Sequence, residues 1–234
     1  ADLRDTERIR RIFAERRPEI VFHAAALKHL TLLERHPGEA VRTNVLGTLA
    51  VLEACQGVSK FINISTDKAA NPTSVLGCSK RITERLTAYA ATRTEGTFLS
   101  VRFGNVLSSR GSVVTAFQRQ IEAGLPLTVT HPDVTRYLMT VQEAVHLVLQ
   151  AAAIGRDGEA LVLEMGEPVR IDDLARQFAE QASRPVEIVY TGLRPGEKLH
   201  EELFGADETD FRPLHPLISH VPVPPLDPAE VRAL

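Results

Sequence analysis

Three short apolar stretches, separated by helix-like segments, constrain the fold of this chain more than any other feature. They are residues 19–26, 61–64 and 97–103. Each is rich in β-branched or aromatic residues and too short for a stable helix, so each predicts a buried strand. Residues 37–55 and 72–91 carry apolar side chains at three- and four-residue spacing, as helices do. Strands that alternate with helices predict an α/β fold with a parallel sheet and right-handed crossovers.

The composition excludes several classes of protein. With 234 residues, of which 44% are hydrophobic, the chain is long enough for one large domain with a smaller appendage. Its net charge of −3 offers no basic surface for nucleic acid. No apolar run approaches the roughly 20 residues of a membrane span, and the histidines and two cysteines show neither metal-ligand spacing nor a disulfide framework. We therefore expect no metal site, no nucleic-acid partner and no membrane contact from this chain itself.

A polar cluster follows the second predicted strand directly. Ser65, Thr66, Asp67 and Lys68 begin where residues 61–64 end, and Lys80 follows on the next helix. Ligands of open parallel sheets bind at the carboxyl ends of the strands. A carboxylic acid can donate a proton there and a neutral amine can accept one. On an extended segment the neighbours Asp67 and Lys68 point different ways and need form no ion pair; the alternative is a helix-capping cluster with surface lysines.

Two further features of the sequence can each be interpreted in two ways. Ala24, Ala25 and Ala26 end the first predicted strand, and small residues there permit either close approach of a ligand or tight helix packing. Asn44 lies inside the predicted helix 37–55, where a polar side chain is ordinarily solvated.

Ordered motifs along most of the chain carry a resemblance to a known family. They are DLRD (2–5), HAAALKH (23–29), RTNVLGT (42–48), STDKA (65–69), SKR (79–81), RFGNVL (102–107), TRY (135–137) and RPGEKL (194–199). Together they resemble the CapD-like polysaccharide-biosynthesis nucleotide-sugar dehydratases, the UDP-N-acetylglucosamine 4,6-dehydratase branch of the extended short-chain dehydrogenase/reductase superfamily. Each motif alone is weak, but the ordered set is specific.

The resemblance implies a Rossmann-like sheet and a division of the chain into three parts. Residues 1–110 would form a truncated dinucleotide-binding domain, and residues 111–210 a small α/β substrate-binding region interleaved with the end of its sheet. Residues 211–234, rich in proline, would form an extended tail. A dinucleotide fold begins with a strand, a glycine-rich turn and a helix that holds the pyrophosphate. No such segment occurs here, so we expect the chain to lack the first βαβ segment and to bind the cofactor weakly by itself.

The resemblance also implies a reaction and its catalytic residues. Bound NAD or NADP takes a hydride from the sugar C4 and returns it to C6, which gives a 4-keto-6-deoxy sugar. Asp67 would be the acid that assists departure of the C6 hydroxyl, and Lys68 the base at C5. Thr66 would bind the C4 hydroxyl, and Lys80 the nicotinamide ribose. Inversion at C5 would be a possible additional outcome.

Binding residues are carried over position by position. The cofactor would meet Asp2, Leu3, Ala24, Ala25, Ala26, Lys28, Asn44, Ser65, Lys80, Phe103, Asn105 and Val106. The UDP-sugar would meet Asn105, Arg136, Arg194 and Glu197. Two arginines suit a diphosphate, because a guanidinium can bind phosphate oxygens in pairs. The alternatives are a simple turn at Arg194, which precedes Pro-Gly, and packing of Arg136 on its aromatic neighbour.

Two positions depart from the family pattern. Leu76 stands four residues before Lys80, where the superfamily usually has a tyrosine that acts as base, and Ser108 stands where related sequences tend to have glycine. Proton transfer at C4 must then use Thr66, Asp67 or water. Two other functions stay open: a nucleotide-sugar 4-epimerase, and a non-catalytic nucleotide-binding module.

The setting of the protein follows from the resemblance alone. We expect a homo-oligomer in the cytoplasm, with a role in surface polysaccharide synthesis. The chain could be the cytoplasmic domain of an inner-membrane protein whose spans lie upstream of Ala1.

Overall fold

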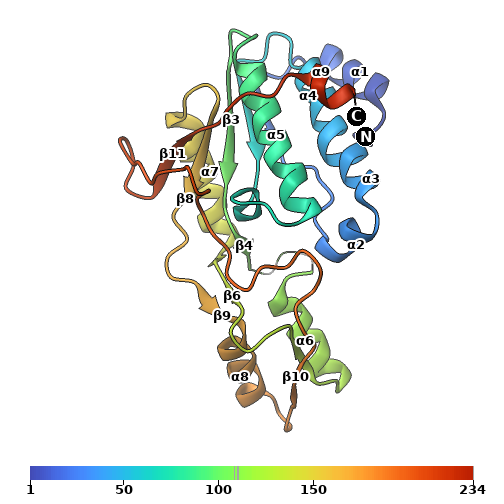
Figure 1. Ribbon diagram of the computed structural model, residues 1–234, viewed down its shortest axis with the longest axis vertical. Coiled ribbons are helices and arrows are strands. Elements are labelled where there is room, and N and C mark those ends of the chain that lie inside the picture. The colour runs from blue at the N-terminus through green and yellow to red at the C-terminus, as the bar shows by residue number, and fades with distance from the viewer. Residues whose placement is uncertain (108, 110, 234) are drawn as a thin grey trace. The chain divides into compact units, whose positions relative to one another are not determined.

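A five-stranded sheet is the central element of the computed structural model, which describes residues 1–107, 109 and 111–233 (Figure 1). Its strand order is β1 (Ile20–His23), β2 (Lys60–Ile64), β3 (Thr97–Arg102), β8 (Glu159–Leu163) and β11 (Ile218–Pro222). The first four strands are parallel, and β11 runs antiparallel to β8. The predicted α/β fold with a mostly parallel Rossmann-like sheet is confirmed.

Helices cover both faces of this sheet. They are α1 (Thr6–Arg16), α4 (Gly47–Ala54), α5 (Val75–Ala91), α7 (Val141–Ile154) and α9 (Pro228–Arg232), while α2 (Leu30–Arg35) and α3 (Pro37–Ala40) pack against α5. Adjacent residues of β3 point to opposite faces, as strand geometry requires. Phe98 packs in a core cluster with residues of α4 and α5, whereas the side chain of Leu99 approaches Gly155 at the end of α7. Because the strand is covered on both faces, all of its residues except Thr97 are buried, and the polar Ser100 and Arg102 are hydrogen-bonded inside the protein.

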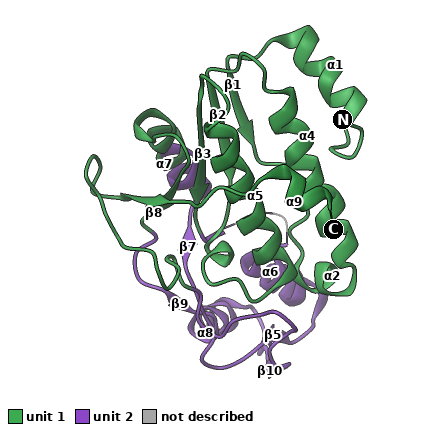
Figure 2. Cartoon of the chain, turned by 45° about the horizontal axis from the view of Figure 1, so that its top comes forward, with its two compact units in different colours: residues 1–103, 147–164, 202–234 green, residues 104–146, 165–201 purple. Residues whose placement is uncertain are grey.

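The described chain forms two compact units (Figure 2). Unit 1 comprises residues 1–103, 147–164 and 202–234, and it contains the five-stranded sheet; unit 2 comprises residues 104–146 and 165–201. Unit 2 contains β4 (Asn105–Val106), α6 (Val113–Ala123), β5 (Leu127–Val129), β6 (Thr135–Arg136), β7 (Leu138–Met139), β9 (Val169–Arg170), α8 (Ile171–Gln181) and β10 (Ile188–Tyr190). Its strands pair in twos, and Phe117 and Leu127 are buried between its elements. Ser108, the second departure from the family pattern, lies outside the described residues.

The predicted helix over residues 37–55 is interrupted. A π-helical segment, Val41–Leu46, separates α3 from α4. Asn44 lies in this segment and is buried, so the expectation of a solvated side chain is wrong. Its amide accepts a hydrogen bond from the Leu27 backbone N–H and donates to the Leu27 carbonyl and to the Ser79 hydroxyl. π-Helical turns recur where a helix presents a particular side chain, and here that side chain fixes the loop after β1.

Two segments at the edges of the sheet differ from expectation. The first strand ends at His23. Ile20 and Phe22, which share one face of β1, are exposed, whereas His23 on the opposite face is buried. The end of the chain is more ordered than its prolines suggest. Ile218 and Val221 of β11 are fully buried, because pairing with β8 places them against the core.

Candidate active site

The segment after β2 continues along β3 before it turns. The Ser65 backbone N–H donates to the Val101 carbonyl (2.7 Å), and the Asp67 N–H donates to the Phe103 carbonyl (3.0 Å). A single 3₁₀ turn, Asp67–Ala69, then ends the extended conformation, and the Thr66 hydroxyl accepts from the Lys68 N–H as its cap. The polar cluster is therefore held at the carboxyl end of the sheet by backbone pairing.

Asp67 and Lys68 form an ion pair inside this turn. Lys68 Nζ lies 3.0 Å from Asp67 Oδ1, and the Thr66 hydroxyl donates to the same oxygen at 2.8 Å. The expectation that the two neighbours point apart is wrong, because the 3₁₀ turn brings them to one side. Asp67 is fully buried, and its Oδ2 has no hydrogen-bond partner among the described residues. An unmatched carboxylate oxygen in a buried position is costly unless a ligand binds it.

Lys80 reaches the same strand end from α5. Its Nζ donates to the carbonyl of Ile64, the last residue of β2, at 2.8 Å. Burial lowers the pKa of Lys80 to about 8, although the Glu84 carboxylate one turn along raises it. His23, at the end of β1, is also buried; burial, reinforced by the charge of Lys80, lowers its pKa to about 4. His23 is therefore neutral at neutral pH, and its Nε2 bonds the Thr48 hydroxyl at 2.9 Å.

The start of α5 packs unusually close to the 3₁₀ turn. Ser74 caps the helix by accepting from the Gly77 N–H. A Cβ at position 77 would lie 2.2 Å from the Lys68 carbonyl oxygen, so only glycine fits there without displacement. Leu76, which replaces the usual tyrosine, is buried in an apolar cluster with Leu33 of α2 and other residues.

The residues expected near the cofactor occupy varied environments in unit 1. Ala24 and Ala25 are exposed on the loop after β1, as is Lys28, while Ala26 is partly buried. Asp2 is bound by Arg4 through an ion pair of 2.7 Å, and Arg4 also holds the pKa of Asp2 at about 2. The structure thus places Ala24, Ala25 and Lys28 on the surface.

The side chains of Leu3 and Ser65 are used inside the protein. Leu3 packs on the core and lies against Gly47. Ser65 donates a hydrogen bond of 2.6 Å to Glu84. A role for either toward a cofactor stays a prediction.

The four residues expected to bind the nucleotide sugar line one cavity of unit 2. The cavity has a volume of about 220 Å³, and Asn105, Arg136, Arg194 and Glu197 all contribute to it. Arg136 is almost buried and pairs with Glu197 at 2.6 Å, rather than only packing on an aromatic ring. Glu197 also accepts from the Thr130 hydroxyl and the Arg194 N–H. Its carboxylate therefore orients the guanidinium of Arg136 and binds the backbone of Arg194, and its contact with a ribose stays a prediction. Val106 lies beside this region in β4, paired with Met139 of β7.

Sequence reasoning missed three charged residues that surround the strand end. Glu84 on α5, Arg102 at the end of β3 and Glu208 near the C-terminus form a buried ion-pair cluster. Two signals were present: Glu84 follows Lys80 by one helical turn, and Arg102 ends a strand of otherwise buried residues. Nothing local in the sequence indicates that Glu208 joins them.

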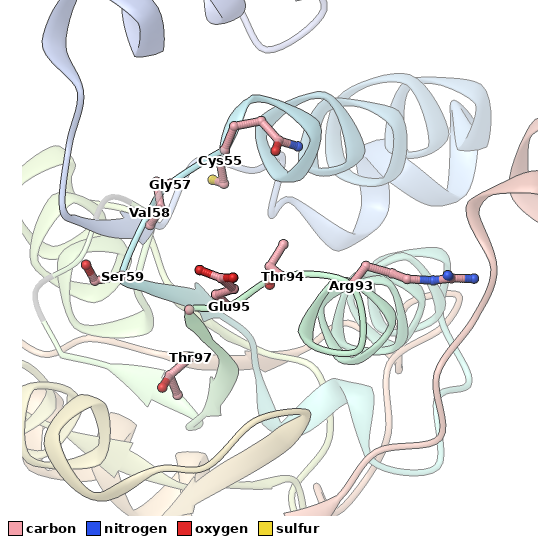
Figure 3. Close-up of a pocket in the computed structure, with 10 residues that line it drawn as sticks. Cys55, Gly57, Val58, Ser59, Arg93, Thr94, Glu95 and Thr97 are labelled. Atoms are coloured by element: carbon pink, nitrogen blue, oxygen red, sulfur yellow. The ribbon is translucent and has the colours of Figure 1, made fainter.

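A larger cavity lies at the opposite ends of the strands (Figure 3). It has a volume of about 500 Å³ and is lined by residues 55–59 and 93–97, which lead into β2 and β3. Glu95 and Ser59 are among its polar groups. The amino ends of parallel strands are not where such folds bind ligands, and the buried polar groups described above lie at the carboxyl ends. We therefore place the candidate active site at the carboxyl ends.

Comparison with known proteins identifies the family. Residues 1–222 match the family described as "Polysaccharide biosynthesis protein". The chain belongs to this family. It is 49% identical over 214 residues to "Capsular polysaccharide biosynthesis protein CapD" of Staphylococcus aureus, a match that covers 89% of this chain and 36% of that protein. The predicted CapD-like membership of the extended short-chain dehydrogenase/reductase superfamily is confirmed. The chain thus spans about a third of the length of that relative.

Other relatives carry a different name or a known structure. The chain is 44% identical over 193 residues to "UDP-glucose 4-epimerase" of Rickettsia rickettsii, which covers 80% of this chain and 56% of the relative. "Pen from Bacillus thuringiensis" superposes with a TM-score of 0.88 at 36% identity, over 96% of this chain and 71% of that one. The Thermus thermophilus UDP-glucose 4-epimerase, solved in complex with NAD, has a TM-score of 0.77 at 23% identity and covers all of this chain and 76% of that one. The likeness to the Thermus thermophilus structure shows that the two chains share a fold.

Across residues 1–107, 109 and 111–233, no helix is both long and apolar enough to cross a bilayer. Within the same ranges no three histidine, cysteine or acidic side chains gather as metal ligands.

Proposed function

We propose that this chain forms the catalytic part of an NAD(P)-dependent dehydratase that converts a UDP-N-acetylhexosamine, UDP-N-acetylglucosamine in the first instance, into a 4-keto-6-deoxy sugar. The observation that carries the proposal is the Asp67–Lys68 pair. An elimination needs an acid at C6 and a base at C5 of one sugar ring. A buried carboxyl group and an amine 3.0 Å apart supply both, and one oxygen of the carboxyl is left for the substrate.

The ion pair can become this acid and base by moving one proton. Transfer from Lys68 Nζ to Asp67 Oδ1 leaves a carboxylic acid and a neutral amine. In that state Lys68 can accept a proton and Asp67 can donate one. Lys68 then takes the C5 proton, while Asp67 gives its proton to the departing C6 hydroxyl. Thr66 keeps Asp67 Oδ1 in place through its hydrogen bond.

The residues of unit 1 fit a nicotinamide cofactor. Lys80 is a buried amine at the carboxyl end of β2, and the loop after β1 exposes only small side chains at Ala24 and Ala25. When bound, NAD or NADP would accept a hydride from C4 and return it to C6, which makes the C5 proton acidic in between. The role of Lys80 is to donate a hydrogen bond to the cofactor's ribose.

The residues of unit 2 fit the diphosphate of a nucleotide sugar. Arg136 and Arg194 both line one cavity, and guanidinium groups bind phosphate oxygens in pairs. Glu197 keeps Arg136 oriented before the ligand arrives. Pre-orientation lowers the entropy that is lost on binding.

A 4-epimerase is the second candidate, because the relative from Rickettsia rickettsii bears that name. Epimerisation also removes a hydride from C4, but it returns the hydride to the same carbon and keeps the C6 oxygen. Epimerisation therefore needs neither a base at C5 nor an acid at C6, which are the roles proposed for Lys68 and Asp67. The two reactions give products that differ by one molecule of water.

Product analysis on the full-length protein tests the proposal. With UDP-N-acetylglucosamine and NAD or NADP, mass spectrometry should detect a product that has lost water. Asp67→Asn and Lys68→Ala should each abolish it, whereas Asp173→Asn, which changes an exposed carboxylate on α8, should not. An isomer of the substrate that retains every oxygen would favour the epimerase. Full dehydration by either variant of the pair would contradict the assignment of acid and base.

A further inference from the structure

A buried cluster of charges lies directly behind the candidate active site, in unit 1. Arg102 has no exposed surface and Glu84 almost none. Arg102 donates to both oxygens of Glu84, at 3.1 and 2.8 Å, and to both oxygens of Glu208, at 2.6 and 3.3 Å. Arg81 lies 3.0 Å from each of the two carboxylates. Both carboxylates thus lie between two guanidinium groups, which favours a single well-defined arrangement of the cluster.

One end of the cluster holds the catalytic segment. Glu84 Oε1, which accepts from Arg102, also accepts from the Ser65 hydroxyl at 2.6 Å. Ser65 directly precedes Thr66 and Asp67. Lys80, one turn before Glu84 on α5, holds the carbonyl of Ile64. The same helix face therefore fixes two consecutive residues at the end of β2.

The other end of the cluster is bound by a segment near the C-terminus, residues 202–208. Arg102 donates to the Leu203 carbonyl at 3.1 Å as well as to Glu208. The Glu208 carboxylate accepts from the Gly205 N–H, which folds the segment over the guanidinium. Glu208 is thus held from both sides. Burial raises the pKa of Glu208, but the hydrogen bonds and charge of Arg102 outweigh this effect and leave the pKa below its ordinary value.

The segment 202–208 also contacts the far end of the catalytic turn. Asn71, three residues after Lys68, donates to Glu202 at 3.1 Å and accepts from the Ala206 N–H at 2.9 Å. Asn71 adopts a left-handed conformation with φ of 43°, which non-glycine residues adopt rarely and asparagine most readily. The segment 202–208 therefore bonds directly to Asn71 on one side of the catalytic turn, and on the other side it is linked to Ser65 through Arg102 and Glu84.

We propose that Glu208, Arg102, Glu84 and Asn71 are positioning residues, through which residues 202–208 fix the conformation of the catalytic turn 66–68. The proposal rests on the proposed function for its catalytic meaning. A role in stability alone is a poor account of the cluster, since apolar side chains of equal volume stabilise a core at least as well as buried ion pairs do. Fixed charges specify one geometry, and a misplacement of about 1 Å in an active site can lower turnover by about 100-fold.

Hydrogen exchange tests the tether without reference to activity. Glu208→Gln removes one charge and keeps the shape of the side chain. Asn71→Gly removes the side-chain contacts and tolerates the left-handed backbone. In both variants the backbone amides of residues 65–71 should exchange faster. The matched control is Arg85→Ala: Arg85 also ties α5 to the C-terminal region, through the carbonyls of Pro224 and Pro225, but on the exposed surface. Exchange at residues 65–71 that is unchanged in Glu208→Gln and Asn71→Gly, or equally faster in Arg85→Ala, overturns the tether.

Turnover by the full-length protein tests the catalytic meaning. At a temperature where all variants stay folded, Glu208→Gln and Asn71→Gly should lower kcat by roughly 10- to 100-fold with little change in KM, and Arg85→Ala should leave both unchanged. Glu208→Asp, which restores the charge, should recover part of kcat. Faster exchange with unchanged kcat overturns the positioning role. If the wild-type protein dehydrates no UDP-sugar, the proposed function fails, while hydrogen exchange still decides whether the tether exists.

Discussion

Replacing Gly77 by alanine adds one methyl group at the closest approach between α5 and the catalytic turn. The new Cβ would lie 2.2 Å from the Lys68 carbonyl oxygen, about 1.2 Å short of the 3.4 Å at which ordinary contact begins. A backbone oxygen cannot rotate away as a flexible side chain can. Either α5 or the turn that carries Asp67 and Lys68 must therefore move by about 1 Å.

Two opposing effects set the magnitude. Alanine in a helix is favoured over glycine by about 1 kcal/mol, whereas forcing a methyl group into a packed site costs about 1–3 kcal/mol. Because the carbonyl oxygen is rigid and very close, the packing cost of Gly77→Ala should lie at the upper end of that range. After the gain in helix preference is subtracted, the free energy of unfolding should fall by about 2 kcal/mol. In a protein of this size that corresponds to a Tm lower by about 4–8 °C. Displacement of Lys68 should also lower kcat by up to about 100-fold.

Calorimetry and turnover measurements on the full-length protein check both numbers. Gly38→Ala is the matched control, because Gly38 lies in α3 and a Cβ there would meet nothing within 4 Å. It should leave kcat unchanged and the Tm equal or slightly higher. If Gly77→Ala keeps the wild-type Tm and kcat, the close packing of α5 on the catalytic turn does not constrain the site.

Two further predictions concern a buried histidine and a cavity arginine. The pKa of His23 is lowered from 6.5 to about 4, so between these values the unfolded chain binds a proton that the folded chain does not. Acidification through this window should remove roughly 3 kcal/mol of stability. The free energy of unfolding by urea should therefore depend less steeply on pH in His23→Gln than in the wild type, whereas the exposed His29→Gln should follow the wild type. Equal pH dependence in His23→Gln and the wild type would contradict the assignment. Arg136→Lys keeps the charge but loses the paired donors, so calorimetry should show about tenfold weaker binding of UDP. The exposed Arg170→Lys should bind UDP like the wild type, and equal affinity of Arg136→Lys would exclude Arg136 from the diphosphate site.

Local patterns were sufficient to predict the sheet and many helices. The helix predicted within residues 72–91 is α5 (Val75–Ala91), and β2 follows from the run 61–64, in which three of the four residues are apolar. The strand-end position of Asp67 follows from these elements alone, because a buried strand has to end where polar residues begin. The motifs supplied the family, which periodicity could not.

Local sequence patterns could not predict contacts between residues that are far apart in the chain. The ion pair of Asp67 with Lys68 depends on a 3₁₀ turn, and that turn is held by backbone bonds from β3 and by the close approach of Gly77. β11 is short, contains histidine and ends in proline, so only its pairing with β8 reveals it as a core strand. Similarly, Glu208 lies more than a hundred residues beyond Arg102, its partner.

That separation also sets an order of events during synthesis. The guanidinium of Arg102 emerges with β3, but its second carboxylate belongs to Glu208. At about 5–20 residues per second, the intervening chain of roughly 100 residues takes on the order of 5–20 s to be made. Until then, burial of β3 would place the Arg102 guanidinium in the core with only one of its two carboxylate partners, that of Glu84. The nascent chain therefore cannot complete the sheet and the catalytic turn before residue 208 has been made. A chain truncated before residue 208 should be cleaved by proteases more readily than the longer chain.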